Sequence, residues 1–496
     1  MRIRRLAFEV RMNRYPFIEE VSTSLTAPEV FELIKDNPYS FFLDSGMDPQ
    51  RLGRYSFIGS NPFLLMKSRG TEITFIQGNN PELSSGEVQY GNPFDALGRL
   101  LDIYKLERRS TPVPFLGGAV GYLSYDLCHF IEHLPSTAID DRKFPESYFA
   151  FYDAIFAFDH FEGRTYIIST GFPELEESRR LRRAEIRLAE IKKWFYSLRS
   201  AQEISLIRTE GMEEVLHSSN FTPEEYIKAV GKVREYIAAG DVFQVNLSQR
   251  FEANLTVPPY ALYRRLRQVN PAPFASYLNF DGVTVVSASP ERFLKLQGDL
   301  VETRPIKGTR PRGKDSVEDA ALAQELLHSI KDRAENIMIV DLERNDLGRV
   351  CRYGSIKVTE LAILETFPTV FHLTSTIVGR LRQDKSNIDL LKAAFPGGSI
   401  TGAPKVRAME IIDELEPTKR SIYTGSIGYL SFNGDIDLNI VIRTFLIKGD
   451  KAYFQVGGGI VYDSNPEAEY RETLDKAKAL IQALQLAPEV VVCTKY

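Results

Sequence analysis

The stretch Gly240-Asp241-Val242-Phe243-Gln244-Val245-Asn246-Leu247-Ser248 marks the point where a predicted helix ends and a predicted strand begins. The helix starts at Thr222-Pro223-Glu224-Glu225, with Thr as N-cap and Pro in the first turn. Beyond residue 248, strand-like and helix-like segments follow one another without the regular rhythm of βαβ units. This mixture predicts an α+β fold rather than a doubly wound parallel sheet.

The chain upstream of this point has two different characters. Residues 55–59, 64–67 and 73–76 read as strands separated by turns. Residues 173–219 contain a highly charged segment that predicts one amphipathic helix joining the two halves, with apolar residues at helical spacing: Leu181, Ile186, Leu188 and Ile191. We therefore divide the chain into an N-terminal region (1–172), a helical linker (173–219), a larger second region (220–486) and a C-terminal tail (487–496).

Composition excludes several classes of protein. With 496 residues, a formal net charge of −5 and a pI of about 5.9, the chain has no electrostatic footprint for nucleic acid. Three scattered cysteines without a CxxC pair exclude a disulfide framework or a thiolate zinc site. The basic N-terminus is not followed by an apolar run, and no window approaches about 20 apolar residues. We expect a cytoplasmic protein with no membrane or nucleic-acid partner.

One short sequence is repeated within the chain. The tetrapeptide Gly121-Tyr122-Leu123-Ser124 reappears as Gly428-Tyr429-Leu430-Ser431, each time in a strand-like context. Two related positions in a sheet and simple coincidence both remain open.

The segment Pro305-Ile306-Lys307-Gly308-Thr309-Arg310-Pro311-Arg312-Gly313 carries the strongest chemical signal. A lysine amine becomes nucleophilic when desolvation or neighbouring cations lower its pKa, and Arg310 and Arg312 are such cations. The alternative interpretation is a solvated lysine in a basic loop.

Acidic residues gather in two predicted helices far apart in the sequence. Glu335 lies at the edge of an apolar helical run, and Glu469, Glu472 and Lys476 share one face of a second helix. Surface ion pairs would explain this pattern, but so would the convergence of Glu335 and Glu472 on Mg²⁺, which prefers few carboxylates. Because no cluster of His or Cys exists, a hard cation is the only metal that the sequence suggests.

Other segments point to an anionic ligand. Residues 396–404 and Gly457-Gly458-Gly459 are glycine-rich and allow close approach of backbone amides to an anion, although turn chemistry also explains them. Arg443, in an apolar strand-like run, requires an anion, which could be Asp435, Asp437 or a substrate carboxylate. His372 lies in another apolar run, where a core role and a catalytic role both remain open.

Taken in order, these segments resemble the chorismate-utilising enzymes, in particular the large subunits of anthranilate synthase and aminodeoxychorismate synthase. The resemblance is dense over about 220–480 and looser in the first half. The matching segments are 240–250, 289–291, 305–313, 331–346, 396–410, 425–444 and 457–476, with 42–45, 51–59 and 117–125 in the first half. It implies two facing, twisted antiparallel β-sheets with helices packed outside, to which both halves of the chain contribute strands. Region 220–486 would be the chorismate-binding catalytic region.

The resemblance also implies roles for individual residues. Glu335 and Glu472 would hold Mg²⁺ against the ring carboxylate of chorismate, Glu291 would be the acid/base group at the departing C4 hydroxyl, and His372 matches a histidine linked to elimination in anthranilate formation. The implied substrate contacts are Thr309, Tyr429, Arg443, Gly457, Gly458, Gly459 and Lys476.

Lys307 distinguishes the members of the family. Anthranilate synthases typically carry alanine there, whereas in many aminodeoxychorismate synthases this lysine attacks C2 of chorismate, and ammonia then displaces it to give 4-amino-4-deoxychorismate for p-aminobenzoate and folate. The resemblance thus favours an aminodeoxychorismate synthase large subunit. Two alternatives remain: an anthranilate synthase component I of tryptophan biosynthesis, and a non-catalytic subunit that binds chorismate or tryptophan. Gln244 replaces the lysine that isochorismate and salicylate synthases use to activate water.

Two further features concern regulation and the nitrogen source. A tryptophan pocket, if present, would involve Leu43, Asp44, Ser45, Phe274 and Ala275. Asp44 replaces the usual Glu, and Phe274-Ala275 replaces the usual Tyr-Met of tryptophan-regulated relatives, so tryptophan feedback stays in doubt. The chain lacks a Gly-x-Cys-x-Gly-His-Gln motif, so a separate glutamine amidotransferase subunit would supply the ammonia.

Overall fold

A computed structural model describes residues 14–45, 47–77, 86–198, 207–208, 217–367, 370–485 and 490–491. Apart from 490–491, the predicted C-terminal tail lies outside the described residues. Among those residues, no helix is long and apolar enough to cross a membrane.

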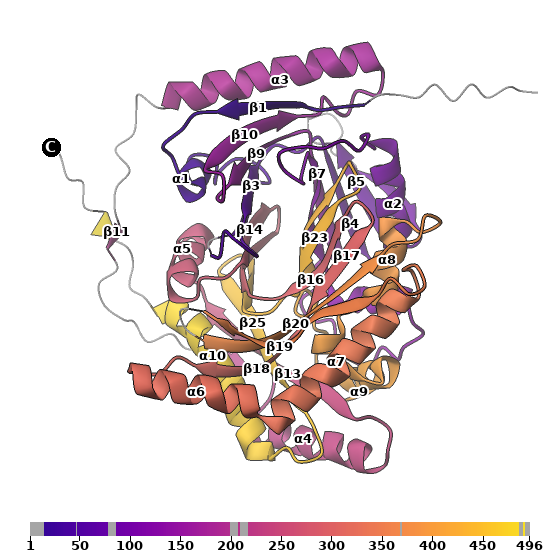
Figure 1. Ribbon diagram of the computed structural model, residues 1–496, viewed down its shortest axis with the longest axis vertical. Helices are drawn as coiled ribbons and strands as arrows, with labels where there is room; N and C mark the ends of the chain where they lie inside the picture. The colour runs from indigo at the N-terminus through magenta and orange to yellow at the C-terminus, as the bar shows by residue number, and fades with distance from the viewer. Residues whose placement is uncertain are drawn as a thin grey trace, which may run out of the picture.

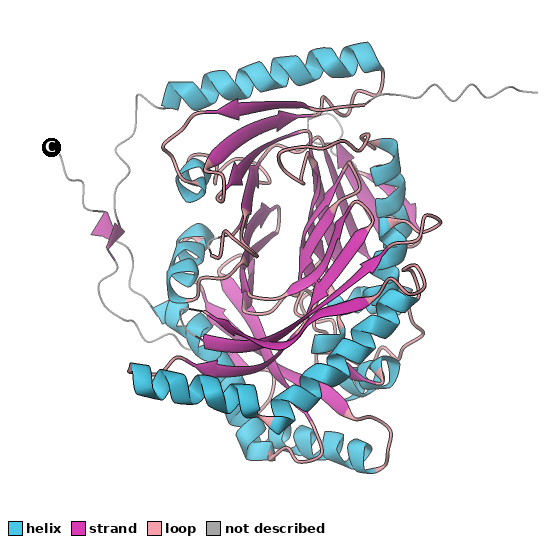
Figure 2. Ribbon diagram, viewed as in Figure 1, coloured by secondary structure: helices cyan, strands magenta, loops and turns pink. Residues whose placement is uncertain are grey.

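Two antiparallel sheets, each of twelve strands in the described part of the chain, form the centre of the molecule (Figure 2). The first sheet has the order β1 (Phe17–Val21), β10 (Arg164–Ser169), β9 (Ala154–Asp159), β3 (Tyr55–Gly59), β2 (Phe41–Asp44), β14 (Phe274–Phe280), β15 (Val283–Ser289), β24 (Thr444–Lys448), β25 (Lys451–Ile460), β13 (Gln244–Asn254) and β12 (His217–Ser219), with β21 (Gly402–Ala403) beside β13.

The second sheet has the order β18 (Ile306–Pro311), β20 (Val370–Arg380), β17 (Leu300–Arg304), β16 (Arg292–Gln297), β23 (Ile436–Asn439), β22 (Ser426–Ser431), β7 (Gly118–Leu123), β8 (Ser147–Tyr152), β4 (Leu64–Arg69), β5 (Glu72–Gln77) and β6 (Glu87–Tyr90), with β19 (Lys357–Thr366) beside β20. Each sheet combines strands from both halves of the chain. The α+β class and the two-sheet arrangement that the resemblance implied are therefore confirmed.

Helices surround the sheets (Figure 1). They are α1 (Ala27–Glu32), α2 (Pro93–Ile103), α3 (Glu177–Leu198), α4 (Pro223–Ala238), α5 (Pro259–Val269), α6 (Ser316–His328), α7 (Ile330–Gly348), α8 (Asn387–Ala394), α9 (Lys405–Leu415) and α10 (Pro466–Gln485), with 3₁₀ turns η1 (Tyr125–Phe130) and η2 (Gly398–Ile400). A short pair, β11 (Ile207–Arg208) and β26 (Val490–Val491), completes the described elements.

The main core lies between the two sheets and is rich in aromatic rings. Phe41 of β2 contacts Tyr152 of β8 across this core at 4.5 Å between ring centroids, and Phe57 of β3 contacts Tyr429 of β22 at 5.4 Å. All four rings are at least 95% buried. Burial of aromatic rings from opposite sheets contributes strongly to stability because each ring removes a large apolar area from water.

The predicted helix start at Thr222 is confirmed. The Thr222 hydroxyl accepts a hydrogen bond from the Glu225 amide at 3.2 Å, and the Glu225 carboxylate accepts one from the Thr222 amide at 2.8 Å. This capping box satisfies two amides that α4 cannot pair internally. β13 follows at Gln244, as the sequence predicted.

The predicted linker helix is α3, which covers β1 and β10 at one end of the first sheet (Figure 1). Its buried face differs from the predicted one. Leu181 and Ile186 are exposed, whereas Ala184 and Phe195 are fully buried. Arg180 is also fully buried, and its guanidinium donates a hydrogen bond to the carbonyl of Thr170 at 2.6 Å. Because the buried Arg180 is charged, the apolar pattern in the sequence did not identify which face of α3 packs against the sheet.

The repeated Gly-Tyr-Leu-Ser segments lie on neighbouring strands. β7 and β22 pair with Gly121 opposite Gly428, at the place where the two halves of the chain meet in the second sheet. A Cβ atom at Gly121 would lie 1.9 Å from the carbonyl oxygen of Tyr148, and one at Gly428 would lie 2.1 Å from that of Asp437. Glycine is required at both positions because neighbouring backbone occupies the side-chain space.

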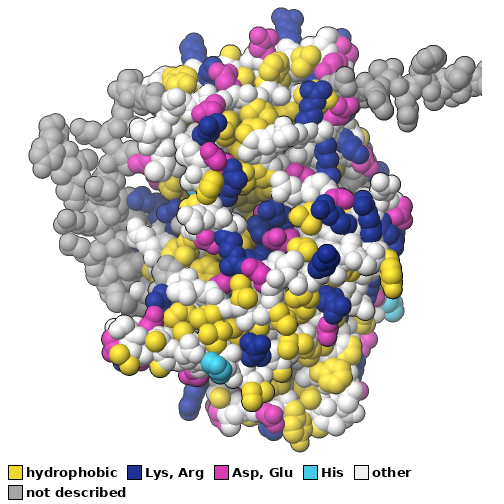
Figure 3. All heavy atoms as spheres, viewed as in Figure 1, with side chains coloured by type: hydrophobic (Ala, Val, Ile, Leu, Met, Phe, Trp, Pro, Cys, Tyr) yellow, Lys and Arg dark blue, Asp and Glu magenta, His cyan; other side chains and the backbone are white. Residues whose placement is uncertain are grey.

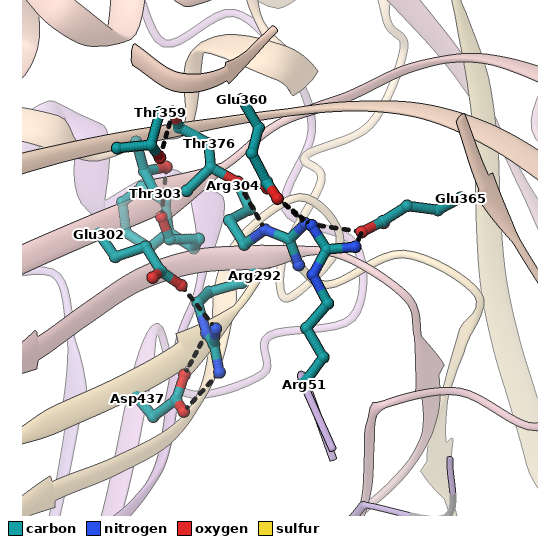
Figure 4. Close-up of polar contacts among 11 residues, drawn as sticks. Arg51, Arg292, Glu302, Thr303, Arg304, Thr359, Glu360, Glu365, Thr376 and Asp437 are labelled. Carbon is teal, nitrogen blue, oxygen red and sulfur yellow. Dashed lines mark hydrogen bonds and ion pairs between the residues drawn. The ribbon is translucent and has the colours of Figure 1, made fainter. Parts of the chain in front are cut away.

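A network of charged residues also joins the two halves of the chain, around β17, β19 and β20 of the second sheet (Figure 4). Arg51, from the loop between β2 and β3, binds Glu365 of β19 at 2.7 Å and also pairs with Glu360. Arg304 of β17 binds the same Glu365 oxygen at 2.6 Å and the Thr376 hydroxyl at 2.9 Å. The network thus fastens the first-half loop to the strands around β20.

Candidate active site

A cavity of about 780 Å³ opens where β18, β20 and β25 meet helices α7 and α10. Its lining combines charged and polar side chains from both sheets with the backbone of the glycine-rich end of β25. On the face shown in Figure 3, acidic and basic side chains alternate, in keeping with the small net charge. Most of the residues singled out from the sequence line this one cavity. They are Glu291, Lys307, Thr309, Glu335, His372, Arg443, Gly457, Gly459, Glu472 and Lys476.

Lys307 lies on β18, the edge strand of the second sheet, and its side chain is half-buried in the cavity wall. Burial lowers the pKa of its amine, and the charge of Lys476 acts in the same direction, while Glu335 and Glu291 oppose the shift. A buried amine with a lowered pKa has a larger neutral, nucleophilic fraction.

The two arginines after Lys307 do not have the predicted effect on its pKa. Arg310 pairs with Glu325 and with Asp332, and Arg312 forms two hydrogen bonds with the carboxylate of Asp319. Their charges are neutralised locally, and the cation that acts on Lys307 comes from α10 instead.

Glu291 follows β15 directly and is buried at the inner end of the cavity. Its carboxylate accepts hydrogen bonds from the Ser399 hydroxyl at 2.6 Å and from the Ile306 amide at 3.3 Å. Burial raises its pKa to about 7, and the positive charges of Lys307 and Arg443 limit the rise. A carboxyl with this pKa can both give and take a proton at neutral pH.

A second buried carboxyl, Glu343 of α7, lies behind Glu291 and was not found from the sequence. Burial and the nearby Glu291 raise its pKa to about 8. The Thr303 hydroxyl lies 2.9 Å from Glu343 and 2.7 Å from the carbonyl of Phe293. The Thr303 hydroxyl thus bridges Glu343 and this carbonyl and can donate its proton to either oxygen.

The carboxylates of Glu335 and Glu472 come from different helices and meet at the cavity. Burial is the main cause of the raised pKa of Glu335. The negative charge of Glu472 contributes to the same shift, so the two carboxylates interact. Lys476 lowers the pKa of Glu472, which it contacts at 2.8 Å. Glu469 lies beside them with one buried oxygen, Oε2, that lacks a hydrogen-bond partner among the described residues.

This donor set suits Mg²⁺, which takes few protein carboxylates and completes its shell with water and substrate oxygens. Within the described residues, no three side chains of the His, Cys, Asp or Glu type converge closely enough to hold a metal by themselves. An ion at this place would therefore depend on oxygens of a bound ligand. Glu335 and Glu472 are the pair that would face it.

The three glycines lie within β25, which extends through them to Ile460. Gly457 and Gly459 line the cavity, but a Cβ at Gly459 would lie 2.0 Å from the amide nitrogen of Gln244. At Gly458 it would lie 3.4 Å from carboxylate oxygens of both Glu469 and Glu472. The Gln244 amide thus occupies the side-chain space at Gly459, whereas the contacts at Gly458 would be of ordinary van der Waals length.

Arg443 lies between β23 and β24, with a positive φ of 51°, rather than in a strand as predicted. Asp435 and Asp437 are not its partners, since they pair with Arg108 and Arg292. In the described part of the chain, no carboxylate forms an ion pair with Arg443. Burial lowers its pKa to about 10, against the effect of Glu291, so the guanidinium stays charged at neutral pH. An unpaired charge in a cavity wall calls for an anionic ligand.

Tyr429 does not line the cavity, which corrects its assignment as a substrate contact. Its ring is buried in the core between the sheets, stacked on Phe115 at 4.5 Å. The tyrosine that lines the cavity near Arg443 is Tyr423, six residues earlier. Tyr429 lies in the matching segment 425–444 and Tyr423 lies just before it, and only the fold shows which of them lines the cavity.

His372 of β20 and Thr309 of β18 are joined by a hydrogen bond of 2.9 Å between Nδ1 and the hydroxyl. Burial lowers the pKa of His372 to about 3, and Arg443 adds to this shift, so the ring is neutral at physiological pH. Its other nitrogen, Nε2, is buried and has no partner among the described residues. The ring is thus poised to bind a ligand group.

The residues of the predicted tryptophan pocket lie together, since β2 and β14 pair with Asp44 opposite Ala275 and Leu43 opposite Ser276. The Ser45 hydroxyl donates to the carbonyl of Pro273, next to Phe274, at 3.2 Å. Asp44 is buried and already binds Arg267 at 2.5 Å and the Tyr263 hydroxyl at 2.9 Å.

Comparison with known proteins now identifies the family. The chorismate binding enzyme family matches residues 60–482. Aminodeoxychorismate synthase component 1 of Bacillus subtilis (strain 168) is 41% identical over 446 residues, covering 89% of this chain and 92% of that protein. Anthranilate synthase component 1 of Acetivibrio thermocellus is 40% identical over 485 residues, covering 96% and 97%.

The fold agrees with these sequences. The crystal structure of anthranilate synthase component I from Streptococcus pneumoniae TIGR4 superimposes with a TM-score of 0.74 at 34% identity, over 86% of this chain and 92% of that one. The family match at residues 60–482 includes all the residues that line the cavity, and the chain therefore belongs to the family of chorismate binding enzymes.

Proposed function

We propose that the chain is the large subunit of an aminodeoxychorismate synthase, which converts chorismate and ammonia to 4-amino-4-deoxychorismate. The observation that carries the proposal is Lys307, an amine with a lowered pKa in the wall of the cavity, within electrostatic range of the acid/base candidate Glu291. The relative from Bacillus subtilis carries the same activity in its name.

In the proposed reaction, the neutral Lys307 amine attacks C2 of chorismate, both ring double bonds shift, and the C4 hydroxyl leaves as water with the proton of Glu291. The attacking nitrogen then passes its extra proton to the Glu291 carboxylate. Ammonia adds at C4, the double bonds shift back, and the lysine leaves C2 as a neutral amine, because the proton that the new C4 nitrogen loses reaches the departing nitrogen through Glu291. The product keeps its pyruvyl group. Glu291 suits this role because its pKa of about 7 allows proton transfer in both directions.

Chorismate is a dianion with one carboxylate at each end, and the two carboxylates would meet different walls of the cavity. Arg443 would bind the enolpyruvyl carboxylate, with Tyr423 nearby, while Thr309, Lys476 and the backbone at Gly457 and Gly459 would contact the ring end. Glu335 and Glu472 would hold a Mg²⁺ ion, which supplies positive charge to the ring carboxylate when bound. We expect chelation of divalent cations to abolish turnover, and added Mg²⁺ to restore it.

Anthranilate synthase component I is the second candidate, because its members are about as similar in sequence. His372 favours it, since a neutral imidazole with a free nitrogen in the cavity suits the elimination of pyruvate. A silent binding subunit is disfavoured because Glu291, Lys307, Glu335, Arg443 and Glu472 are all present.

The product decides between these candidates. The purified chain is incubated with chorismate, Mg²⁺ and ammonium at pH 8, and the products are identified by mass spectrometry. We expect aminodeoxychorismate without pyruvate. Fluorescent anthranilate with stoichiometric pyruvate would contradict the proposal.

The nitrogen source is tested separately. We propose that glutamine supports turnover only when a glutamine amidotransferase subunit is added, in keeping with the name "component 1" of the relatives. Turnover with glutamine by this chain alone would argue against a separate subunit.

A further inference from the structure

Asn270 is a buried residue of the cavity that the proposed mechanism does not use. It follows α5 and lines the same wall as Arg443, and its side chain is only 4% exposed. Its backbone amide donates to the carbonyl of Leu266 at 2.8 Å, which fixes the residue at the end of the helix. The side chain is thus held in place by the fold rather than by a ligand.

Only one end of the Asn270 side-chain amide has a hydrogen-bond partner in the described chain. Its oxygen accepts a hydrogen bond from Nη1 of Arg443 at 3.3 Å, whereas its nitrogen, Nδ2, is buried and has no partner among the described residues. The reverse orientation of the amide would place an N–H group against the guanidinium, donor against donor. Arg443 therefore sets the orientation, which leaves two N–H donors of Asn270 for the cavity.

A buried amide nitrogen without an acceptor is costly, and a ligand oxygen would remove that cost. Arg443 presents further N–H groups beside it and has no carboxylate partner in the described chain. Its backbone is fixed as well, because its carbonyl accepts a hydrogen bond from the Ala288 amide at 3.1 Å. Two rigidly held donors of the same kind lie side by side.

We propose that Asn270 is a substrate-binding residue whose Nδ2 donates to the carboxylate that Arg443 binds, so that the two side chains form one forked carboxylate site. The inference rests on chorismate as the ligand and holds for either amino product. It adds to the proposed function a neutral donor that fixes the orientation of the carboxylate as well as its charge.

The test measures chorismate binding by calorimetry with Mg²⁺ and without ammonia. We expect Asn270→Ala to weaken binding about tenfold, the effect of one hydrogen bond to a charged group. Asn270→Asp should weaken it more, roughly a hundredfold, because the new carboxylate pairs with Arg443 and repels the substrate.

Native-like binding by Asn270→Asp, or an unchanged affinity in Asn270→Ala, would overturn the inference. Asn279→Asp is the matched control, since this asparagine of β14 bonds the carbonyl of Lys35 away from the cavity. A double variant with Arg443→Ala separates binding from orientation: in this background, Asn270→Ala should still weaken chorismate binding, whereas a residue that only orients Arg443 would cause no further loss. Failure of the native chain to bind chorismate would instead count against the proposed function itself.

Discussion

The charged network around Arg304 and the cavity around Lys307 are neighbours on the second sheet. The charged groups of the network are paired, whereas several polar groups of the cavity have no partner in the described part of the chain. Arg304 precedes Lys307 by three residues, and Glu365 lies opposite His372 in the β19–β20 ladder. In the network, Arg51 and Arg304 each pair with both Glu360 and Glu365 (Figure 4).

In the cavity, by contrast, several buried groups lack partners among the described residues: Asn270 Nδ2, His372 Nε2 and Glu469 Oε2. Arg443 also lacks a carboxylate. Unpaired buried polar groups cost stability, and these three lie in a cavity where a ligand would supply the missing partners. The network stabilises the strands, whereas the cavity leaves polar groups open to a ligand.

The largest expected effect concerns Glu291. We expect Glu291→Gln to lower turnover roughly 100- to 10,000-fold, the range for a removed general acid. In the native chain, the rate of the step that needs the protonated form should fall as pH rises through about 7, the pKa that burial gives Glu291. Steady-state rates from pH 5 to 9 test this. A variant as active as the native chain would remove Glu291 from the mechanism.

The network and the cavity should respond differently to loss of an arginine. Arg304→Met leaves two carboxylates with one fewer partner, and we expect the free energy of unfolding to fall by about 3–5 kcal/mol. Arg443→Met removes a charge that no carboxylate of the described chain pairs, so stability should stay the same or rise, while chorismate affinity falls roughly 30-fold or more.

Urea unfolding and calorimetric titration of both variants measure the contrast. Equal destabilisation by the two substitutions would mean that Arg443 has a structural partner, and the distinction between the regions would fail. Lys314→Ala, in an exposed loop, serves as the neutral control.

The ionisation of Glu291 should also appear in stability. Its pKa is raised from 4.5 to about 7 on folding, so the folded state holds the proton more tightly. The stabilising contribution is complete below about pH 4.5 and is lost as pH rises to about 7. Glu291→Gln avoids this loss, and its stability relative to the native chain should increase by about 2–3 kcal/mol between pH 4.5 and 8. A pH-independent difference would contradict the raised pKa.

The smallest expected effect is that of tryptophan. Because Asp44 is already bound by Arg267 and Tyr263, we expect no free carboxylate to receive the amino group of tryptophan. Added L-tryptophan should leave both the rate and the thermal midpoint unchanged. Inhibition by tryptophan, relieved in Asp44→Ala, would show that this pair opens to admit it.

Local signals in the sequence predicted what depends on neighbours in the chain. The capping box at Thr222, the strand from Gln244 and the strands near residues 55–76 follow from side-chain preferences within a few residues. The arrangement of the two sheets came from the family resemblance, because pairing such as Gly121 with Gly428 joins residues three hundred positions apart.

Site residues were predicted correctly where the residue type itself indicates the chemistry. They were missed where the role depends on the three-dimensional arrangement. Lys307, Glu291 and the carboxylates of α7 and α10 meet in one cavity. Tyr423 lies in the turn before β22 and Tyr429 lies within β22, and only the folded chain shows which of them reaches the cavity. Asp435 and Asp437 could not be excluded as partners of Arg443 until Arg108 and Arg292 were placed beside them. Glu343 carried no local sign of its burial.

The most direct test of the account is to look for the bond between Lys307 and the substrate. The chain is incubated with chorismate and Mg²⁺ without ammonia, denatured rapidly, and analysed by intact-mass and peptide mass spectrometry, with Lys307→Ala alongside. We predict an adduct of chorismate minus water on the peptide containing Lys307, absent from the variant, which should also lose turnover. No adduct on the native chain, together with full activity of Lys307→Ala, would contradict the account.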